Sequence, residues 1–480
     1  MVKPRRTLVI VAAAVLLPGA APASRRASYD PTLADQYQQP SRPDVVPADE
    51  QARRMLAANR AFEAVLYGTA SVLQYRQMYQ QAVDRDDRGF TGFNRFAHDR
   101  ALAGPDYAIF KTPNADTLYS CAWLDLTAGP VILDVPPTGG RYFTVNLLDM
   151  FANASNISTR THGNAGGRFL IATTDWRGEV PAGVRLFRVT TPHMWLLLRI
   201  LVERKTDVAP ANALQDRFRL EPLGREVEPL RYPSPGGETA TDFLRVLDFL
   251  LVTDGHPRSE DALIAQFAAI GVGAGQFDPS AIDPATREGI EQGYQQARAA
   301  IAASLKQRTD GNSEWRFARD VGRYGTHYLL RSVLNTLGTG ANVRDENGTF
   351  SAFSDANGAP LDGAANSYCL MLAPPPGRYF WSVTLYDLRT KALFPNPLGR
   401  YVIGDRTEGL QRTQTGAVPI VVRATPPSRA KTTNWLPAPK GPFYLVVRGQ
   451  GPSADLVEGR WVPNPILPAA RCPLERDTAR

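Results

Sequence analysis

Two stretches, PPTGGRYFTVNLLD at Pro136–Asp149 and PPPGRYFWSVTLYD at Pro374–Asp387, repeat one pattern within a single chain. Each has a proline pair, a glycine turn, Arg-Tyr-Phe, and alternating apolar residues that end in Asp. Alternation bounded by Gly and Pro is typical of a half-buried β-strand. The repetition of this strand predicts a duplicated β-module.

Two more pairs of segments follow in the same order. GRFLI at Gly167–Ile171 corresponds to GRYVI at Gly399–Ile403, and WLLLR at Trp195–Arg199 corresponds to YLVVR at Tyr444–Arg448. One short match would be weak, since strands are built from few residue types. Three collinear matches predict an α+β protein with two jelly-roll-like antiparallel β-sandwiches that arose by internal duplication.

Helical periodicity appears in two regions outside the strands. From Ala48 to Val83 apolar residues recur at three- and four-residue steps, and Gly68 is expected to break this run into two helices. A second helical region runs from Thr239 to Leu337. The predicted organisation is a signal peptide at 1–23, a loose arm at 24–47, an N-terminal helical segment at 48–105, a first β-sandwich at 106–235, a helical insert at 236–345, a second β-sandwich at 346–470 and a tail at 471–480.

The N-terminus has the features of an export signal. Lys3, Arg5 and Arg6 precede the apolar run Thr7–Leu17, and small residues up to Ala23 suit a signal peptidase. The apolar run is shorter than the ~20 residues that cross a bilayer. We therefore expect cleavage near Ala23 and a secreted or periplasmic protein with no membrane span in the mature chain.

Composition excludes several classes of partner and cofactor. Removal of the three basic residues of the signal lowers the net charge from +7 to +4, which is too mild to indicate nucleic-acid binding. The run Gly271–Phe277 lacks the preceding strand of a dinucleotide site, so no cofactor is expected. No metal site is expected either, because the histidines and cysteines show no ligand spacing. The odd cysteine count, Cys121, Cys369 and Cys472, leaves one thiol free or paired between chains.

The motifs resemble those of a known bacterial family pair. The N-terminal half is similar to domain of unknown function 1254 on NRFAHDRAL, TPNADTLYSCAWLDL, GRYFTVNLLD and TRTHGN. The C-terminal half is similar to its usual companion, domain of unknown function 1214, on NPLGRYVIGDRT, NWLPAPKGPFYLVVR and EGRWVPNP. The resemblance implies jelly-roll-like sandwich modules and frequent export, and it implies no particular reaction.

Candidate catalytic residues cluster in the first module. Asp116 and Tyr119 lie in TPNADTLYS, His98 lies in a polar run, and Arg160 and His162 lie in a loop between strands. A carboxylate and a histidine are a common acid and base, and an arginine stabilises a developing anion. The alternative roles are structural: Asp116 would form an Asx-type turn, and each histidine would be a buried group whose hydrogen bonds serve only the fold.

Candidate ligand-binding residues are polar groups in loops of both modules: Asn114, Asn164, Asp405, Arg406, Asn434 and Trp435. An exposed Trp beside Asn is common equipment for stacking on a sugar ring. The alternatives are a turn role for Asn114 and a plug at one end of the sandwich for Trp435.

Two functions follow from these residues. One is an exported hydrolase or lyase with a polar small-molecule site on the first sandwich. The other is a non-catalytic protein that binds a carbohydrate-like or other small ligand. The discriminating feature is whether His98, Asp116 and His162 converge in one pocket.

Overall fold

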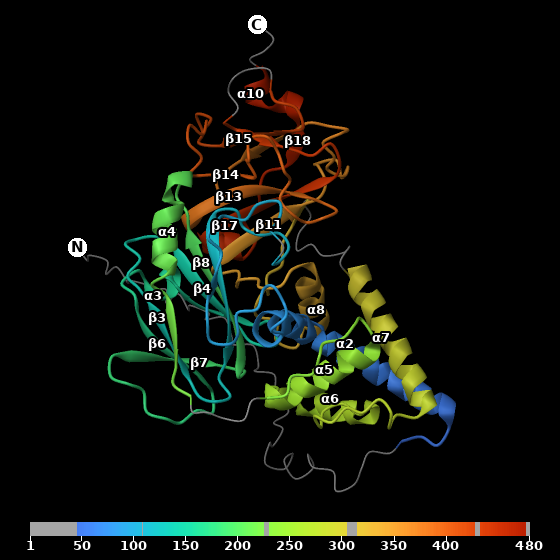
Figure 1. Ribbon diagram of the computed structural model, residues 1–480. Helices are drawn as coiled ribbons and strands as arrows, with labels where there is room; N and C mark the ends of the chain where they lie inside the picture. Colours follow the sequence, from blue (N-terminus) through green and yellow to red (C-terminus); the bar gives the residue numbers. More distant parts are fainter. Residues whose placement is uncertain (1–45, 108, 225–229, 305–313, 428–432, 477–480) are drawn as a thin grey trace, which may run out of the picture. The chain divides into compact units, whose positions relative to one another are not determined.

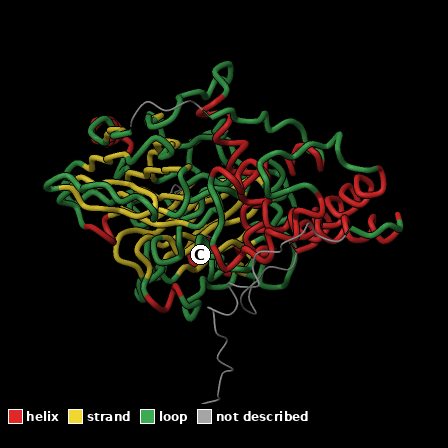
Figure 2. Tube along the Cα trace, turned by 90° about the horizontal axis from the view of Figure 1, so that it is seen from below, coloured by secondary structure: helices red, strands yellow, loops and turns green. Residues whose placement is uncertain are grey.

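The computed structural model describes residues 46–107, 109–224, 230–304, 314–427 and 433–476. The predicted signal peptide at 1–23 and nearly all of the predicted arm at 24–47 lie outside the described residues. Figure 1 labels many of the elements, and Figure 2 shows most of the helical turns to one side of the strands.

The first sandwich pairs a five-stranded sheet with a four-stranded one. The five-stranded sheet has the order β1-β2-β8-β4-β5. Its strands are β1 (Ala97–His98), β2 (Thr117–Asp125), β8 (His193–Leu201), β4 (Phe143–Leu148) and β5 (Ala154–Ser158). The other sheet has the order β7-β6-β3-β9, formed by β7 (Val184–Val189), β6 (Gly167–Thr173), β3 (Val131–Val135) and β9 (Arg219–Pro222). One apolar core, which includes Leu118, Val131, Val145 and Phe169, joins the two sheets.

The second sandwich repeats this plan. Its five-stranded sheet has the order β10-β11-β17-β13-β14. The strands are β10 (Trp315–Arg316), β11 (Asn347–Ala352), β17 (Phe443–Pro452), β13 (Gly377–Asp387) and β14 (Val402–Gly404). The four-stranded sheet has the order β16-β15-β12-β18, formed by β16 (Trp435–Pro437), β15 (Val418–Arg423), β12 (Tyr368–Leu372) and β18 (Ile466–Pro468).

The duplication extends to the register of the central strands. The first repeat forms β4 and β13, and the third forms β8 and β17, so each module pairs the same two motifs. Thr144 on β4 lies opposite Arg199 on β8, and Ser382 on β13 lies opposite Arg448 on β17. Arg199 and Arg448 therefore occupy equivalent positions in the two sheets.

Two expectations about the strands need correction. Gly167–Ile171 lies in β6, but Gly399–Ile403 leads into β14, an edge strand of a five-stranded sheet. The topological counterpart of β14 is β5, so the second repeat does not join equivalent strands. The sandwiches are also not wholly antiparallel, because β6 pairs with β7 and β15 with β16 in parallel.

Helices pack on the outer face of the first five-stranded sheet, where Trp123 and Trp195 stack with their centroids 5.3 Å apart. The longer ones are α2 (Glu50–Met78), α5 (Ala240–Thr253), α7 (Pro284–Ser304) and α8 (Tyr328–Leu337). Of the shorter helices, α6 (Asp261–Ala265) packs in the same cluster, whereas α4 (Val208–Gln215) packs against the core of the first sandwich and α9 (Ala454–Val457) against that of the second. The remaining short helices are α3 (Thr159–His162) and α10 (Pro473–Arg476). Single turns are η2 (Tyr79–Val83), η3 (Lys205–Asp207), η4 (Arg258–Glu260), η5 (Gln266–Ile270) and η6 (Ala469–Arg471). Within the described ranges, no helix combines the length and apolarity needed to span a bilayer.

Gly68 does not break the first helix as expected. α2 begins after Asp49, whose side chain caps the N–H of Ala52, and runs unbroken through Gly68 to Met78. A Cβ at Gly68 would lie 2.8 Å from the side chain of Leu247 on α5. The glycine therefore permits close packing of two helices, which offsets its cost of about 1 kcal/mol in a helix interior.

Helix α7 approaches α2 through a glycine in the same way. A Cβ at Gly293 would lie 2.2 Å from the carbonyl oxygen of Ala58 and 2.9 Å from the Cβ of Ala61. Backbone atoms cannot move aside as a flexible side chain can. The spacing of α2 and α7 therefore depends on the missing side chain.

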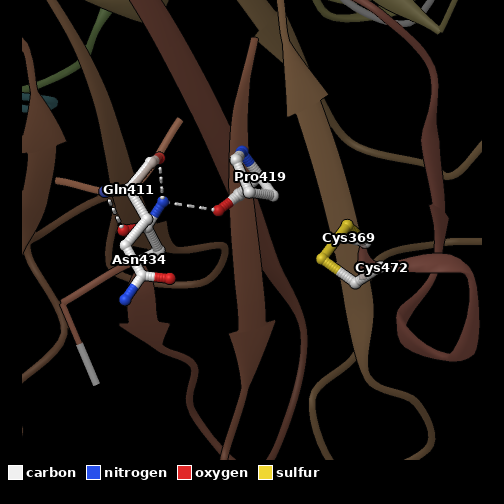
Figure 3. Close-up of a disulfide and its surroundings, with 5 residues drawn as sticks. All are labelled: Cys369, Gln411, Pro419, Asn434 and Cys472. Atoms are coloured by element: carbon white, nitrogen blue, oxygen red, sulfur yellow. Dashed lines mark hydrogen bonds between the residues drawn. A yellow bond between two sulfur atoms is a disulfide. The ribbon is translucent and has the colours of Figure 1, made fainter. Parts of the chain in front are cut away.

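Cys369 on β12 forms a disulfide with Cys472, 103 residues further along the chain (Figure 3). Cys121 is the free and buried thiol. Burial, followed by the charge of Asp99, raises the pKa of Cys121 to about 12, so the group stays a neutral thiol.

Candidate functional site

A cavity of about 300 Å³ lies between the outer faces of the two five-stranded sheets, and we call it the central cavity. The first sheet contributes Tyr119 and Arg199, and the loop before β2 contributes residues 110–112 and Asn114. The second sheet contributes Asn347, Thr349, Ser351, Tyr444, Arg448 and Gln450, and Phe353 follows directly after β11. The end of α8 with its following loop, and the segment 316–318, close the remaining sides. The volume is at the lower end of the range for small-ligand sites.

The alternation of β8 places Arg199 in this cavity. Leu196, Leu198 and Ile200 face the sandwich core, whereas Trp195 and Leu197 face outward toward the helices. Arg199 follows the outward set, beyond the part of the sheet that the helices cover. β8 is otherwise apolar, so its one arginine places a single positive charge in the space between the modules.

The guanidinium of Arg199 is only partly satisfied. Its Nη2 donates to the carbonyl oxygen of Gly340 at 2.8 Å, and its Cζ lies 5.3 Å from the ring centroid of Tyr119. Its Nη1 is buried and has no hydrogen-bond partner. A buried N–H without an acceptor costs roughly 1–3 kcal/mol, so this group is a donor available to a ligand.

The equivalent arginine of the second sheet is fully engaged. Arg448 is 6% exposed, and its Nη1 donates to the hydroxyl of Tyr386 at 2.9 Å and to that of Thr384 at 3.3 Å. Its Nη2 donates to the carbonyl oxygen of Thr112 at 3.0 Å. Arg448 thus ties the loop before β2 to the second sheet and fixes a buried positive charge at the wall of the cavity.

Positive charge dominates the whole lining. The basic side chains are Lys111, Arg199, Arg316, Arg344, Lys391 and Arg448, and the lining contains no Asp or Glu. Two buried carboxylates adjoin it in sequence, but other arginines engage both. Asp116 pairs with Arg406 at 3.1 Å, and Glu346 pairs with Arg160 at 2.7 Å. The wall of the central cavity therefore carries no balancing carboxylate of its own, and Asp116 acts on the charge of Arg448 from outside the lining.

Aromatic rings give the cavity an apolar side. Phe353 stacks on Tyr444 with centroids 5.0 Å apart, and the guanidinium of Arg316 lies 5.0 Å from the ring centroid of Phe353. The hydroxyl of Tyr444 shares a hydrogen bond of 2.7 Å with that of Thr112. Such a wall suits a ligand with a flat apolar body and a negatively charged end.

The predicted catalytic residues do not come together. His98 bonds to the hydroxyl of Ser120 at 2.8 Å, and His162 bonds to that of Thr161 at 2.7 Å. Burial, with Arg100 and Arg185 respectively, lowers the pKa of both histidines. Among the interactions of the described residues, none joins Asp116 to either histidine.

Arg160 is also remote from any acid–base pair. It binds Glu346, which accepts further hydrogen bonds from Tyr142 at 2.8 Å and Ser158 at 2.9 Å. Glu346 is 0% exposed. This cluster joins the first sandwich to the segment that enters β11, so it is a structural contact.

Asp116 lies instead beside two residues predicted as ligand-binding groups of the second module. Arg406 donates to Asp116 at 3.1 Å and to Asp405 at 2.8 Å, and its Cζ lies 4.3 Å from the ring centroid of Phe380. Burial, and then the charge of Asp116, raises the pKa of Asp405 against the lowering effect of Arg406. The sequence placed these three residues in two separate sites, whereas the structure brings them into one contact between the modules.

Asn114 and Tyr119 are the predicted site residues that line the central cavity. Asn114 also forms the Asx turn considered for it, because its side chain accepts from the N–H of Asp116 at 2.8 Å. The hydroxyl of Tyr119 accepts from the N–H of Asn114 at 2.8 Å. Asn164 lies elsewhere and holds a turn by donating to Thr138 and to the carbonyl oxygen of Arg141.

Asn434 and Trp435 are internal groups of the second sandwich. The amide of Asn434 donates to the carbonyl oxygens of Gln411 at 2.9 Å and Pro419 at 2.8 Å, as Figure 3 shows beside the disulfide. Trp435 is 6% exposed and packs in the cluster that contains the disulfide. Neither is accessible for stacking on a sugar.

One sequence feature does mark the two arginines, although no polar motif contains them. Arg199 and Arg448 end the third repeat, and each is a charge in an otherwise apolar strand. A charge at the same place in both copies indicates a cavity lined by both sheets only once the two modules are known to face each other. Lys111 and Lys391 had no distinguishing sequence pattern at all.

The fold and the cavity define the chain as a tandem of two related β-sandwich domains with a cationic cavity between them. Residues 93–222 match the family described as Protein of unknown function (DUF1254), and residues 346–454 match that described as Protein of unknown function (DUF1214). The chain carries these two domains in that order.

A solved structure shares this fold. The VPA0106 protein from Vibrio parahaemolyticus is 26% identical, with a TM-score of 0.69 over 86% of this chain and 99% of that chain. A protein from Burkholderia cenocepacia is 11% identical, with a TM-score of 0.40 over 86% of this chain and 95% of its own. No curated protein matches the chain.

Proposed function

We propose that this protein is exported and binds a small organic anion in the central cavity. The observation that carries the proposal is a lining with six basic side chains and no carboxylate, in which Nη1 of Arg199 is buried without a partner. A carboxylate or phosphate oxygen would accept from that N–H and neutralise part of the charge. The signal peptide predicted at 1–23 supports a site of action in the periplasm or the medium.

Acid–base hydrolysis is the weaker assignment. It requires an acid and a base within hydrogen-bond reach of one substrate. His98, His162 and Asp116 each have separate partners, and none of the three lines the cavity. A sugar ligand is likewise less favoured, since Trp435 is buried.

A thermal-shift experiment on the mature chain, residues 24–480, tests the proposal. Benzoate combines a carboxylate with a flat apolar ring, and benzamide has the same shape without the charge. We expect benzoate to raise the melting temperature at fixed ionic strength and benzamide to leave it unchanged. Saturation at 100 times the Kd would contribute about 2.7 kcal/mol of stability.

Variants locate the site. Arg199→Met should weaken benzoate binding about 10- to 150-fold, since a hydrogen bond to a charged group contributes about 1.5–3 kcal/mol. Arg217→Met is the matched control, because Arg217 is exposed and does not line the cavity. Equal responses to benzoate and benzamide, or a benzoate response that survives Arg199→Met, would overturn the assignment.

A further inference from the structure

Lys391 is held at the central cavity by an unusual backbone conformation. Its φ is 59°, in the left-handed region that costs a residue with a Cβ about 1–2 kcal/mol. Its N–H donates to the carbonyl oxygen of Asp387 at 2.9 Å, and its own carbonyl accepts from the N–H of Thr112 at 3.0 Å. The Asp387 side chain caps the same turn. Lys391 is therefore fixed in place from both modules.

The ammonium of Lys391 has a cation beside it and no anion. The side chain is partly buried, and no ion pair or hydrogen bond of the described residues engages its Nζ. Burial, and then the charge of Lys111, lowers the pKa of Lys391. Both effects increase the fraction of free amine near neutral pH, and a free amine is a nucleophile.

The surroundings suit one class of electrophile. The amine shares the cavity with Arg199, whose unpartnered Nη1 is a donor for a carboxylate, with the buried charge of Arg448, and with the stacked pair Phe353 and Tyr444. A lysine desolvated beside another cation is a known arrangement for imine formation with carbonyl substrates. A ligand that carries both a carboxylate and a ketone would present the ketone to the amine.

We propose that Lys391 forms an imine with the carbonyl group of an oxo acid whose carboxylate Arg199 holds. The nitrogen lone pair attacks the carbonyl carbon to give a carbinolamine. The nitrogen then loses its protons, the former carbonyl oxygen leaves as water, and a C=N bond replaces C=O. One water is released and no electrons are transferred. This inference rests on the proposed anion site and adds the class of ligand.

Reductive trapping tests the proposal. The mature chain is incubated with phenylpyruvate and sodium cyanoborohydride, which reduces an imine to a stable secondary amine, and the product is analysed by intact mass and peptide mapping. We expect one adduct per chain, located at Lys391. Lys391→Arg keeps the positive charge and should abolish the adduct, whereas Lys440→Arg, at an exposed site, should leave it unchanged.

Phenyllactate separates this proposal from the anion site on which it rests. It has the carboxylate and the ring but a hydroxyl in place of the ketone. If it raises the melting temperature and competes with trapping, the anion site stands.

A thermal shift by phenyllactate without any adduct at Lys391 from phenylpyruvate would refute the imine alone. Adducts spread over exposed lysines, and undiminished in Lys391→Arg, would refute it too. No binding of either acid would refute the anion site.

Discussion

The two equivalent arginines should respond in opposite ways to removal of their charge. Methionine keeps most of the side-chain volume and lacks the guanidinium. In the absence of ligand, we expect Arg448→Met to destabilise the protein strongly and Arg199→Met to have little effect on stability. The two residues occupy matching places in the duplicated sheets, so the difference measures what each guanidinium bonds to.

The magnitudes follow from the hydrogen bonds. Arg448→Met removes bonds at 2.9 Å to Tyr386 and 3.0 Å to Thr112, with a longer one to Thr384. Two bonds to a charged donor, at about 1.5–3 kcal/mol each, predict a loss of roughly 3 kcal/mol or more.

Arg199→Met loses one bond, to the carbonyl oxygen of Gly340 at 2.8 Å, and the contact with the ring of Tyr119. It also removes the buried Nη1 that has no partner, and the loss of this unsatisfied donor should raise the free energy of unfolding by about 1–3 kcal/mol. These contributions nearly cancel, so we expect a change within about 1 kcal/mol of zero.

Urea unfolding curves, followed by tryptophan fluorescence without added anion, measure both variants against the wild type. Equal slopes would show that the midpoints report stability and not a change in the unfolded state. The account predicts a midpoint for Arg199→Met close to that of the wild type and a clearly lower one for Arg448→Met. If Arg199→Met lost as much stability as Arg448→Met, then Arg199 would have a structural role, and its unpartnered N–H would not be evidence for a ligand site.

Three other predictions concern the fold. Cys472→Ser should lower the free energy of unfolding by about 2–5 kcal/mol, because the bond to Cys369 closes a long loop; an unchanged denaturation midpoint would contradict this. Gly293→Ala should lower the free energy of unfolding by about 1–3 kcal/mol in the same assay, since its Cβ would meet the backbone of α2. Helix propensity alone predicts that alanine stabilises α7, and a stabilised variant would show that α7 can shift away from α2. Burial lowers the pKa of His193, but the charge and hydrogen bond of Asp254 outweigh burial and raise this pKa above its usual value. The pair should therefore stabilise the fold fully below about pH 6.5, and this stabilisation should fall as the pH rises through the folded pKa. His193→Gln should flatten this pH dependence of the free energy of unfolding.

The repeated motifs predicted the duplicated sandwiches because strand sequence carries both the alternation and the position of the turn. The first and third repeats map to equivalent central strands, where both neighbours and both faces constrain the residues. The second repeat failed at Gly399–Ile403. A glycine and an aromatic residue ahead of a short apolar run form a pattern that many unrelated strands share. Gly68 was misread for another reason, because the side chain that fills its place, Leu247, is distant in sequence.

The central cavity could not be predicted from either module alone. Its lining comes from two sheets, the loop before β2 and the segment after α8, and only the packing of these elements brings Lys111 near Lys391. Polar motifs predicted a site at Asp116, His98 and His162. Such motifs also build turns and module contacts, which are the roles the structure gives to Asp116 and Arg160.

The most direct test of the anion site is a crystal structure of the mature protein grown with 4-bromobenzoate. The bromine gives an anomalous signal that locates the ligand without ambiguity, and the refined carboxylate shows which donors it uses. The account predicts one strong peak inside the central cavity, with a carboxylate oxygen within hydrogen-bond distance of Nη1 of Arg199. An empty cavity at saturating ligand, or a ligand bound with its carboxylate turned away from Arg199 and Arg448, would contradict it.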